Sequence, residues 1–262
     1  MSDVIHSKAP PATPLREETR ERLRGIGTAT LANVLLRHGF RNCYLLGLAP
    51  VDSAHACMVG PAYTLRFIPA REDIDSMVTY QSDANLHRRA IEECPSGAVL
   101  VIDAGGDTSA ASAGDIMIAR LARRGVAGVI TDGGYRDTPS IRRVGQPAFQ
   151  RQSAPPATPI MLHPADLNVP IGCAGVAIYP GDIIVGDEEG VVAIPSHLAD
   201  VVAEEGEAAI QYEEFVELQI TSGRPIFGLF PATDGSRREY EAWVAAGRPK
   251  GSCIDITEER MS

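Results

Sequence analysis

The chain has 262 residues, of which 44% are hydrophobic and 22% are charged, as in an ordinary globular protein. Its formal net charge of −10 argues against a nucleic-acid-binding surface, because Lys and Arg form no compact stripe. The five cysteines are scattered without a C-x-x-C motif, so neither a disulfide framework nor a structural zinc site is expected. We find no secretory signal and no apolar run of membrane-spanning length, and therefore expect a cytoplasmic protein without a membrane partner.

The first part of the chain predicts an arm, helices and a strand. Residues 1–14, rich in Pro, Ala, Ser and Thr, predict a flexible arm. Residues 16–39 predict two helical pieces interrupted around Gly25–Gly27. The run MVGPAYTLRFI, residues 58–68, predicts a strand, and its Pro61 favours an edge or first position because proline donates no ladder hydrogen bond.

A helix and then a βαβ unit follow. The helix is predicted by the helical spacing of residues 76–95, which ends at Pro95. The apolar run AVLVIDA, residues 98–104, predicts a strand that is covered on both faces. GDIMIARLARRG, residues 114–125, predicts a short amphipathic helix, and VAGVIT, residues 126–131, predicts a second buried strand. We expect the two strands to be parallel and their crossover to be right-handed.

The remainder predicts loops, a hairpin and two helices. Residues 140–170 are loop-like and rich in proline. GDIIVGD and GVVAIP, within residues 181–195, predict a β-hairpin. Residues 198–223 predict a long acidic helix, and residues 236–247 predict a last helix that carries the only tryptophan. The expected fold class is therefore a compact α/β domain with a helical C-terminal extension.

Three charges are expected to meet at one edge of this sheet. In a parallel βαβ unit, the carboxyl ends of both strands and the amino end of the helix share an edge, where open α/β sheets bind ligands. Asp115 opens the helix, and Ser112–Asp115 fits a capping box. Arg136 and Asp137 follow the second strand in the stretch TDGGYRD. Asp115, Arg136 and Asp137 should therefore converge.

Such a cluster suits an anionic substrate. Amides at the helix start, around Asp115 to Met117, can hold a carboxylate, and a facing arginine can clamp the same anion or a keto oxygen. The carboxylate of Asp137, completed by waters and substrate oxygens, suits Mg²⁺. These features describe a receptor for a small 2-oxo acid whose enolate would be stabilised by metal and arginine. The alternative is that Asp115 only caps a helix and Arg136–Asp137 is a surface ion pair.

Asp115, twenty intervening residues and then Arg136–Asp137 form a D-x20-R-D pattern. It resembles the class II pyruvate aldolases that act on 4-hydroxy-4-methyl-2-oxoglutarate, a family that also holds the RraA-like regulators of ribonuclease E activity. The resemblance runs from about Thr28 through TDGGYRD to PGDIIVGDEEGVVAIP, and weakly to SGRPIFGLFP. It implies a three-layer β/β/α sandwich of the swivelling-domain type over residues 15–205. Residues 206–262 would be a helical extension packing on a neighbouring subunit of a homotrimer or hexamer.

The resemblance also implies roles for individual residues. Asp137 would bind Mg²⁺ or Mn²⁺, Arg136 would hold a substrate oxygen, and Asp115 would orient metal-bound water. The amides of the helix start would take the substrate carboxylate, namely those of Gly114, Asp115, Ile116 and Met117. Glu213 of the neighbouring subunit would reach the metal through water. Glu214 is nearly equivalent in spacing, and a solvated helix face is the alternative for both glutamates.

Two departures leave the substrate open. The family often continues R-D-x-x-E/D, whereas Ser140 stands at the acidic position here, and the asparagine expected before the preceding helix is displaced to Asn85. We expect a Mg²⁺-dependent carbon–carbon lyase of 2-oxo acids, with oxaloacetate decarboxylation as a side reaction. The alternatives are a dehydratase or hydrolase of a sugar-acid-derived 2-keto acid, and a non-catalytic protein-binding regulator.

Overall fold

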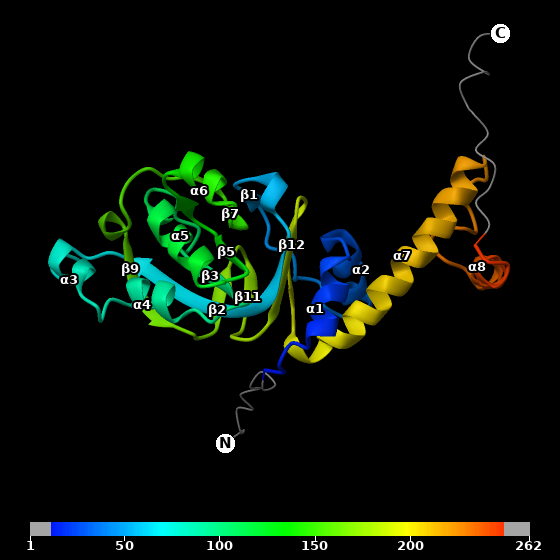
Figure 1. The fold of residues 1–262 in the computed structure, drawn as a ribbon, viewed down its shortest axis with the longest axis horizontal. Helices are drawn as coiled ribbons and strands as arrows, with labels where there is room; N and C mark the ends of the chain where they lie inside the picture. The colour runs from blue at the N-terminus through cyan, green and yellow to red at the C-terminus, as the bar shows by residue number, and fades with distance from the viewer. Residues whose placement is uncertain (1–11, 249–262) are drawn as a thin grey trace, which may run out of the picture. The chain divides into compact units, whose positions relative to one another are not determined.

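The computed structural model describes residues 12–248, so most of the arm expected at residues 1–14 lies outside the described residues (Figure 1). The chain divides into two compact units, Met1–Glu204 and Glu205–Ser262. Within the described residues, no helix is both long and apolar enough to cross a lipid bilayer.

The first unit is built on a mixed sheet of eight strands. Their order is β1-β7-β5-β3-β2-β12-β13, and β9 also pairs with β2. Along the chain these strands are β1 (Ala49–Pro50), β2 (Met58–Pro69), β3 (Val99–Asp103), β5 (Gly128–Thr131), β7 (Ala148–Gln150), β9 (Leu162–Leu167), β12 (Ile183–Asp187) and β13 (Gly190–Ile194). Two small sheets accompany it: β10 (Ile171–Cys173) with β11 (Val176–Ile178), and β4 (Ala111–Ala113), β6 (Gly134–Tyr135) and β8 (Gln152–Ser153).

Helices belong to both units. The first unit contains α1 (Glu17–Arg24), α2 (Thr28–Arg37), α3 (Met77–Gln81), α4 (Leu86–Glu93), α5 (Asp115–Arg123) and α6 (Thr138–Val144), with 3-10 turns η1 (Ser53–His55), η2 (Thr158–Ile160) and η3 (Ser196–Leu198). Helix α7 (Ala199–Thr221) starts in the first unit and continues into the second, which also holds α8 (Asp234–Ala245).

The central strand β3 separates two hydrophobic cores. Leu100 and Ile102 face a core that includes Ile118 of α5. Val99 and Val101 point to the opposite face and join the core of the small β10–β11 sheet. Because successive side chains of a strand alternate between faces, a strand covered on both sides is apolar throughout. The helix, sheet and sheet layers confirm the predicted β/β/α architecture with C-terminal helices.

Several predicted elements are confirmed. Strands β3 and β5 are parallel, with Val99 opposite Gly128, and α5 connects them. Strands β12 and β13 form the predicted antiparallel hairpin. The two N-terminal helices meet at Gly25–Gly27, as expected.

Three local predictions were wrong. Pro61 does not mark an edge, because β2 lies inside the sheet; it pairs with Ile183 of β12 just before the ladder to β3 begins at Ala62. The helical spacing of residues 76–95 is split into α3 and α4, because the Asn85 side chain accepts hydrogen bonds from two amides and starts a new helix. Residues 140–170 are not a loop but contain most of α6, together with β7, β8, η2 and β9.

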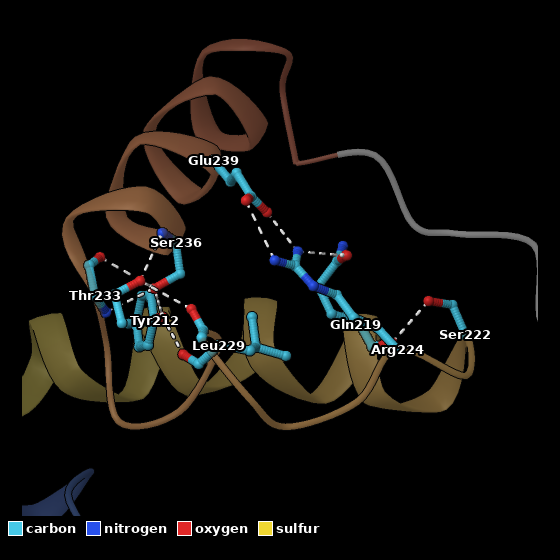
Figure 2. A network of polar contacts seen from close by, with 9 residues as sticks. Tyr212, Gln219, Ser222, Arg224, Leu229, Thr233, Ser236 and Glu239 are labelled. Atoms are coloured by element: carbon cyan, nitrogen blue, oxygen red, sulfur yellow. Dashed lines mark hydrogen bonds and ion pairs between the residues drawn. The ribbon is translucent and has the colours of Figure 1, made fainter.

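The second unit is held together by an aromatic cluster and a polar network. Phe215 is buried among the rings of Tyr212, Tyr240 and Trp243. The Tyr212 hydroxyl donates to the Leu229 carbonyl at 2.6 Å and lies 2.8 Å from the Ser236 hydroxyl. Figure 2 shows this network. These contacts fasten the loop between α7 and α8 to α7.

Candidate active site

Two short parallel strands bring the predicted charges to one edge. Strand β6 pairs with β4, with Gly134 opposite Ala111 and Tyr135 opposite Ala113. The Arg136 amide then donates to the Ala113 carbonyl at 3.1 Å. The residues that follow each strand therefore lie beside one another: Gly114–Asp115 on one side and Arg136–Asp137 on the other.

The glycines of TDGGYRD permit this close packing. A Cβ on Gly133 would lie 2.7 Å from the Asp107 carbonyl oxygen, and one on Gly134 would lie 2.5 Å from the Gln152 carbonyl oxygen. Neither distance is compatible with a side chain, because backbone atoms cannot swing away. Asp137 ends the stretch in the left-handed region, with φ 59°, and acts as the N-terminal cap residue of α6.

Arg136 and Asp137 pack against Gly114. The Arg136 Nε donates to Asp137 Oδ2 at 2.9 Å, and both side chains are nearly half exposed. A Cβ on Gly114 would lie 3.2 Å from both Arg136 Cγ and Asp137 Oδ2. The hydrogen bond and charge of Asp137, and more weakly the charge of Asp115, raise the pKa of Arg136. The structure thus brings Asp115, Arg136 and Asp137 together.

The start of α5 presents backbone amides at this place. Ile118 is the first residue whose amide bonds back within the helix, to Gly114 at 3.1 Å. The preceding amides have no intrahelical acceptor, as at every helix start. That of Ile116 donates to the Asp115 carboxylate at 2.8 Å. The amides predicted to hold a substrate carboxylate therefore have no intrahelical acceptor, and that of Ile116 is bonded to the Asp115 side chain.

The predicted capping box at Ser112–Asp115 is wrong. Gly114 is the cap residue, and no side chain caps α5. Ser112 is instead buried, with its hydroxyl 2.7 Å from the Thr131 hydroxyl. Because β4 places Ser112 against the end of β5, this side chain links the two strands and is not free to cap the helix.

Two of the other residues singled out from the sequence, Ser140 and Glu214, have local partners. Ser140 accepts a hydrogen bond from Arg143 at 2.6 Å. Glu213 is half-buried on α7, and Glu214 is exposed with its carboxylate 3.7 Å from Arg248. Both glutamates belong to the second unit, Glu205–Ser262.

A buried aspartate shapes the neighbouring loop. Asp132 accepts hydrogen bonds from the amides of Ala104 at 2.7 Å, Gly106 at 3.1 Å and Ala174 at 3.2 Å. A buried carboxylate with several amide donors is satisfied where it stands. Asp132 therefore holds the loop after β3 and is a structural residue.

Asp137 is the side chain of this site best placed to bind a metal ion. Among residues 12–248, no group of three or more His, Cys, Asp or Glu side chains is arranged to hold an ion. Asp137 nevertheless offers an accessible carboxylate. A single carboxylate with retained waters and substrate oxygens fits Mg²⁺, which dehydrates reluctantly.

One residue near the site has no signal in the sequence. Tyr80 of α3 is half-buried, and burial raises the pKa of its phenol. The Thr158 side chain, which lies within hydrogen-bonding reach, and the positive charge of Arg136 both act to lower the pKa of Tyr80. The helical spacing of residues 76–95 predicts a helix but not the neighbour that a tyrosine on it meets.

Comparisons with known proteins identify the family of the chain. The sequence matches the RraA-like family, described as Aldolase/RraA, over residues 28–193. A putative 4-hydroxy-4-methyl-2-oxoglutarate aldolase of Halalkalibacterium halodurans is 41% identical over 107 residues, which are 41% of this chain and 50% of that protein. Protein DlpA of Legionella pneumophila is 29% identical over 211 residues, which are 79% of this chain and 32% of that protein. The matches thus span half or less of these two relatives.

Solved structures show the same fold. Streptomyces coelicolor RraAS2, described as an unusual member of the RNase ES inhibitor RraA protein family, has a TM-score of 0.71 and 32% identity over 79% of this chain and 100% of that chain. An uncharacterized protein from Pseudomonas syringae pv. tomato has a TM-score of 0.74 and 26% identity, covering 85% of this chain and 97% of that chain.

Proposed function

The chain belongs to the RraA-like family of aldolases and RraA proteins, and we propose that it is a lyase that cleaves a carbon–carbon bond of a small 2-oxo acid. The observation that carries the proposal is the packing of Arg136 and Asp137 against Gly114 at the start of α5. Aldolase names among the relatives support this activity.

Each part of the site has a chemical task in such a reaction. The amides at the start of α5, at Gly114, Asp115, Ile116 and Met117, bind the substrate carboxylate, which replaces the Asp115 carboxylate at the Ile116 amide and is helped by the helix dipole. The Arg136 guanidinium holds the keto oxygen and stabilises the negative charge that develops there as the enolate forms. Asp115 positions the water that returns a proton to the enolate carbon.

We further propose a divalent cation, Mg²⁺ or Mn²⁺, at this place. Asp137 would be its direct ligand, with Asp115 and Glu213 of a neighbouring subunit acting through water. When bound, the ion supplies positive charge that stabilises the enolate oxygen. The proposal includes a homotrimer or hexamer, because Glu213 would come from a neighbouring subunit.

The activity is tested by screening 2-oxo acids for released pyruvate, with oxaloacetate included. Oxaloacetate is included because its decarboxylation passes through the same enolate. We expect turnover with Mg²⁺ that disappears when a chelator removes the ion. Glu213→Gln should lower turnover, with Glu214→Gln as the alternative position and the exposed Glu217→Gln as the matched control. No release from any 2-oxo acid would overturn the lyase proposal.

A regulator is the second candidate, because RraAS2 is described as a member of an RNase inhibitor family. A protein that only binds another protein has no need of an oriented arginine and carboxylate. Failure to turn over oxaloacetate, together with absence of pyruvate and Mg²⁺ binding by calorimetry, would favour the regulator.

A further inference from the structure

We propose that Tyr80 is a substrate-facing residue of this site, donating a hydrogen bond to an oxygen on the leaving half, and that buried His87 positions it through one bound water. The proposal rests on the proposed lyase function and extends it to the half of the substrate that Arg136 does not hold. It combines three observations: the placement of α3, the environment of the Tyr80 ring, and a small polar cavity beneath it.

Helix α3 is anchored in place although it is only five residues long. Ser76 forms a capping box with Thr79 at its start. The preceding residue, Asp75, lies 2.7 Å from His163 of β9 and accepts from the Arg71 amide at 2.8 Å. The contact with His163 ties the residue before α3 to the sheet, and the other two contacts order the segment from Arg71 to Thr79.

Tyr80 and Thr158 of η2 line the same cavity, and η2 contacts β4, the strand that leads into Gly114. The Arg136 charge acts on the Tyr80 phenol, and the Thr158 side chain lies within hydrogen-bonding reach. Burial is the largest influence on its pKa and keeps the phenol protonated. A protonated phenol is a hydrogen-bond donor, which suits the negatively charged oxygen that the leaving half carries once its hydroxyl has given a proton to the water positioned by Asp115, before the carbon–carbon bond breaks.

His87 packs under Tyr80 and is fully buried. Its ring centroid lies 6.1 Å from that of Tyr80 and 5.2 Å from that of Phe67. Neither ring nitrogen makes a hydrogen bond of good geometry, although a backbone group of Ser112 lies close enough to favour the protonated ring slightly. A buried polar side chain normally has a partner, so these nitrogens need an explanation.

A cavity of about 10 Å³ supplies that explanation. Tyr80, His87, Asn85 and Thr158 are among its lining residues. This volume is about that of a single water molecule, which is stable in a cavity when two to four polar groups surround it. A water there can bond His87 and the Tyr80 hydroxyl together, which sets the direction of the phenolic O–H.

The experiment compares two reactions of the full-length protein. Cleavage of the substrate found in the 2-oxo acid screen requires both halves. Exchange of the pyruvate methyl protons with D₂O, followed by ¹H NMR, requires only the half held by Arg136. The variants are Tyr80→Phe and His87→Leu, with Tyr179→Phe as the matched control, because Tyr179 is an exposed tyrosine after β11.

We expect Tyr80→Phe to lower kcat/KM for cleavage by about 10- to 100-fold, the range for one hydrogen bond to a charged group. Pyruvate exchange should change by less than about threefold, because Tyr80 does not touch that half. His87→Leu should cause a smaller but equally selective loss with little change in Tm, since the variant gives up only a bond to water and buries an apolar side chain in its place. The double variant should lose no more than Tyr80→Phe alone, because both act through one hydroxyl.

Other results would overturn the inference. Equal losses of cleavage and exchange in Tyr80→Phe would mean that Tyr80 only supports Arg136 or the fold. Unchanged cleavage would place Tyr80 outside the site, and a His87→Leu loss that adds fully to that of Tyr80→Phe would remove the water link. A wild-type protein inactive in both reactions would overturn the proposed function itself, and this inference with it.

Discussion

Gly114→Ala tests whether the packing of Arg136 and Asp137 sets the activity. The added Cβ would lie 3.2 Å from Arg136 Cγ and from Asp137 Oδ2, and 3.5 Å from Arg136 Cδ. Carbon contacts are favourable only from about 3.5 Å, so the ion pair must move by a few tenths of an ångström. Both side chains are nearly half exposed, which leaves them room to do so.

The magnitude follows from the sensitivity of catalysis to position. A misplacement of about 1 Å can cost roughly 100-fold in rate, so a shift of a few tenths should lower kcat by about 3- to 10-fold. The fold itself should persist, because φ −126° and ψ 178° at Gly114 are accessible to alanine. The loss of stability should be about 1 kcal/mol or less, the difference between glycine and alanine at a helix N-terminus.

The assay is pyruvate release at saturating and limiting substrate, with Tm measured in parallel. Gly172→Ala is the matched control, because a Cβ there meets nothing within 4 Å. Gly114→Ala should add little to the loss in Arg136→Ala, since the damage passes through Arg136. Full kcat in Gly114→Ala, or losses that add completely in the double variant, would refute the reasoning.

Three further predictions concern single side chains. Arg136→Lys should be nearly as damaging as Arg136→Ala, with kcat/KM reduced by about 10²- to 10³-fold, because a point charge does not reproduce the planar guanidinium; near-normal turnover in the lysine variant would contradict this role. Tyr135→Phe should raise the free energy of unfolding in urea by about 1 kcal/mol, because the Tyr135 hydroxyl is buried without a hydrogen-bond partner; a destabilised variant would mean that the hydroxyl is satisfied in solution. Burial lowers the pKa of His87 from 6.5 to about 4, so below pH 6.5 the unfolded chain takes up a proton there that the folded chain does not. The free energy of unfolding should therefore fall by about 3 kcal/mol between pH 6.5 and 4 from this residue, and His87→Gln should lose that part of the pH dependence in urea titrations, whereas an unchanged dependence would contradict a neutral His87.

Much of the site could be located from local patterns. The apolar runs that became β3 and β5, and the amphipathic spacing of α5, place Asp115 and Arg136–Asp137 at one edge, because a parallel βαβ unit has only one edge where these ends meet. The chemistry of an arginine and a carboxylate beside helix amides also follows from residue types alone. The substrate, the cation and the assembly do not follow in this way and stay predictions.

Long-range packing decided the rest. Ser112 does not cap α5, because β4 places its hydroxyl against that of Thr131. Pro61, which has no amide hydrogen to donate, is tolerated inside the sheet because the ladder between β2 and β3 starts only at Ala62. Asn85 ended one helix and began another, which turned α3 into a separate element carrying Tyr80. By itself, the sequence determined which segments are buried, since hydrophobic periodicity is local. The tertiary structure decided which polar side chains face one another, because His87, Tyr80 and Arg136 lie on different elements whose contacts no local spacing encodes.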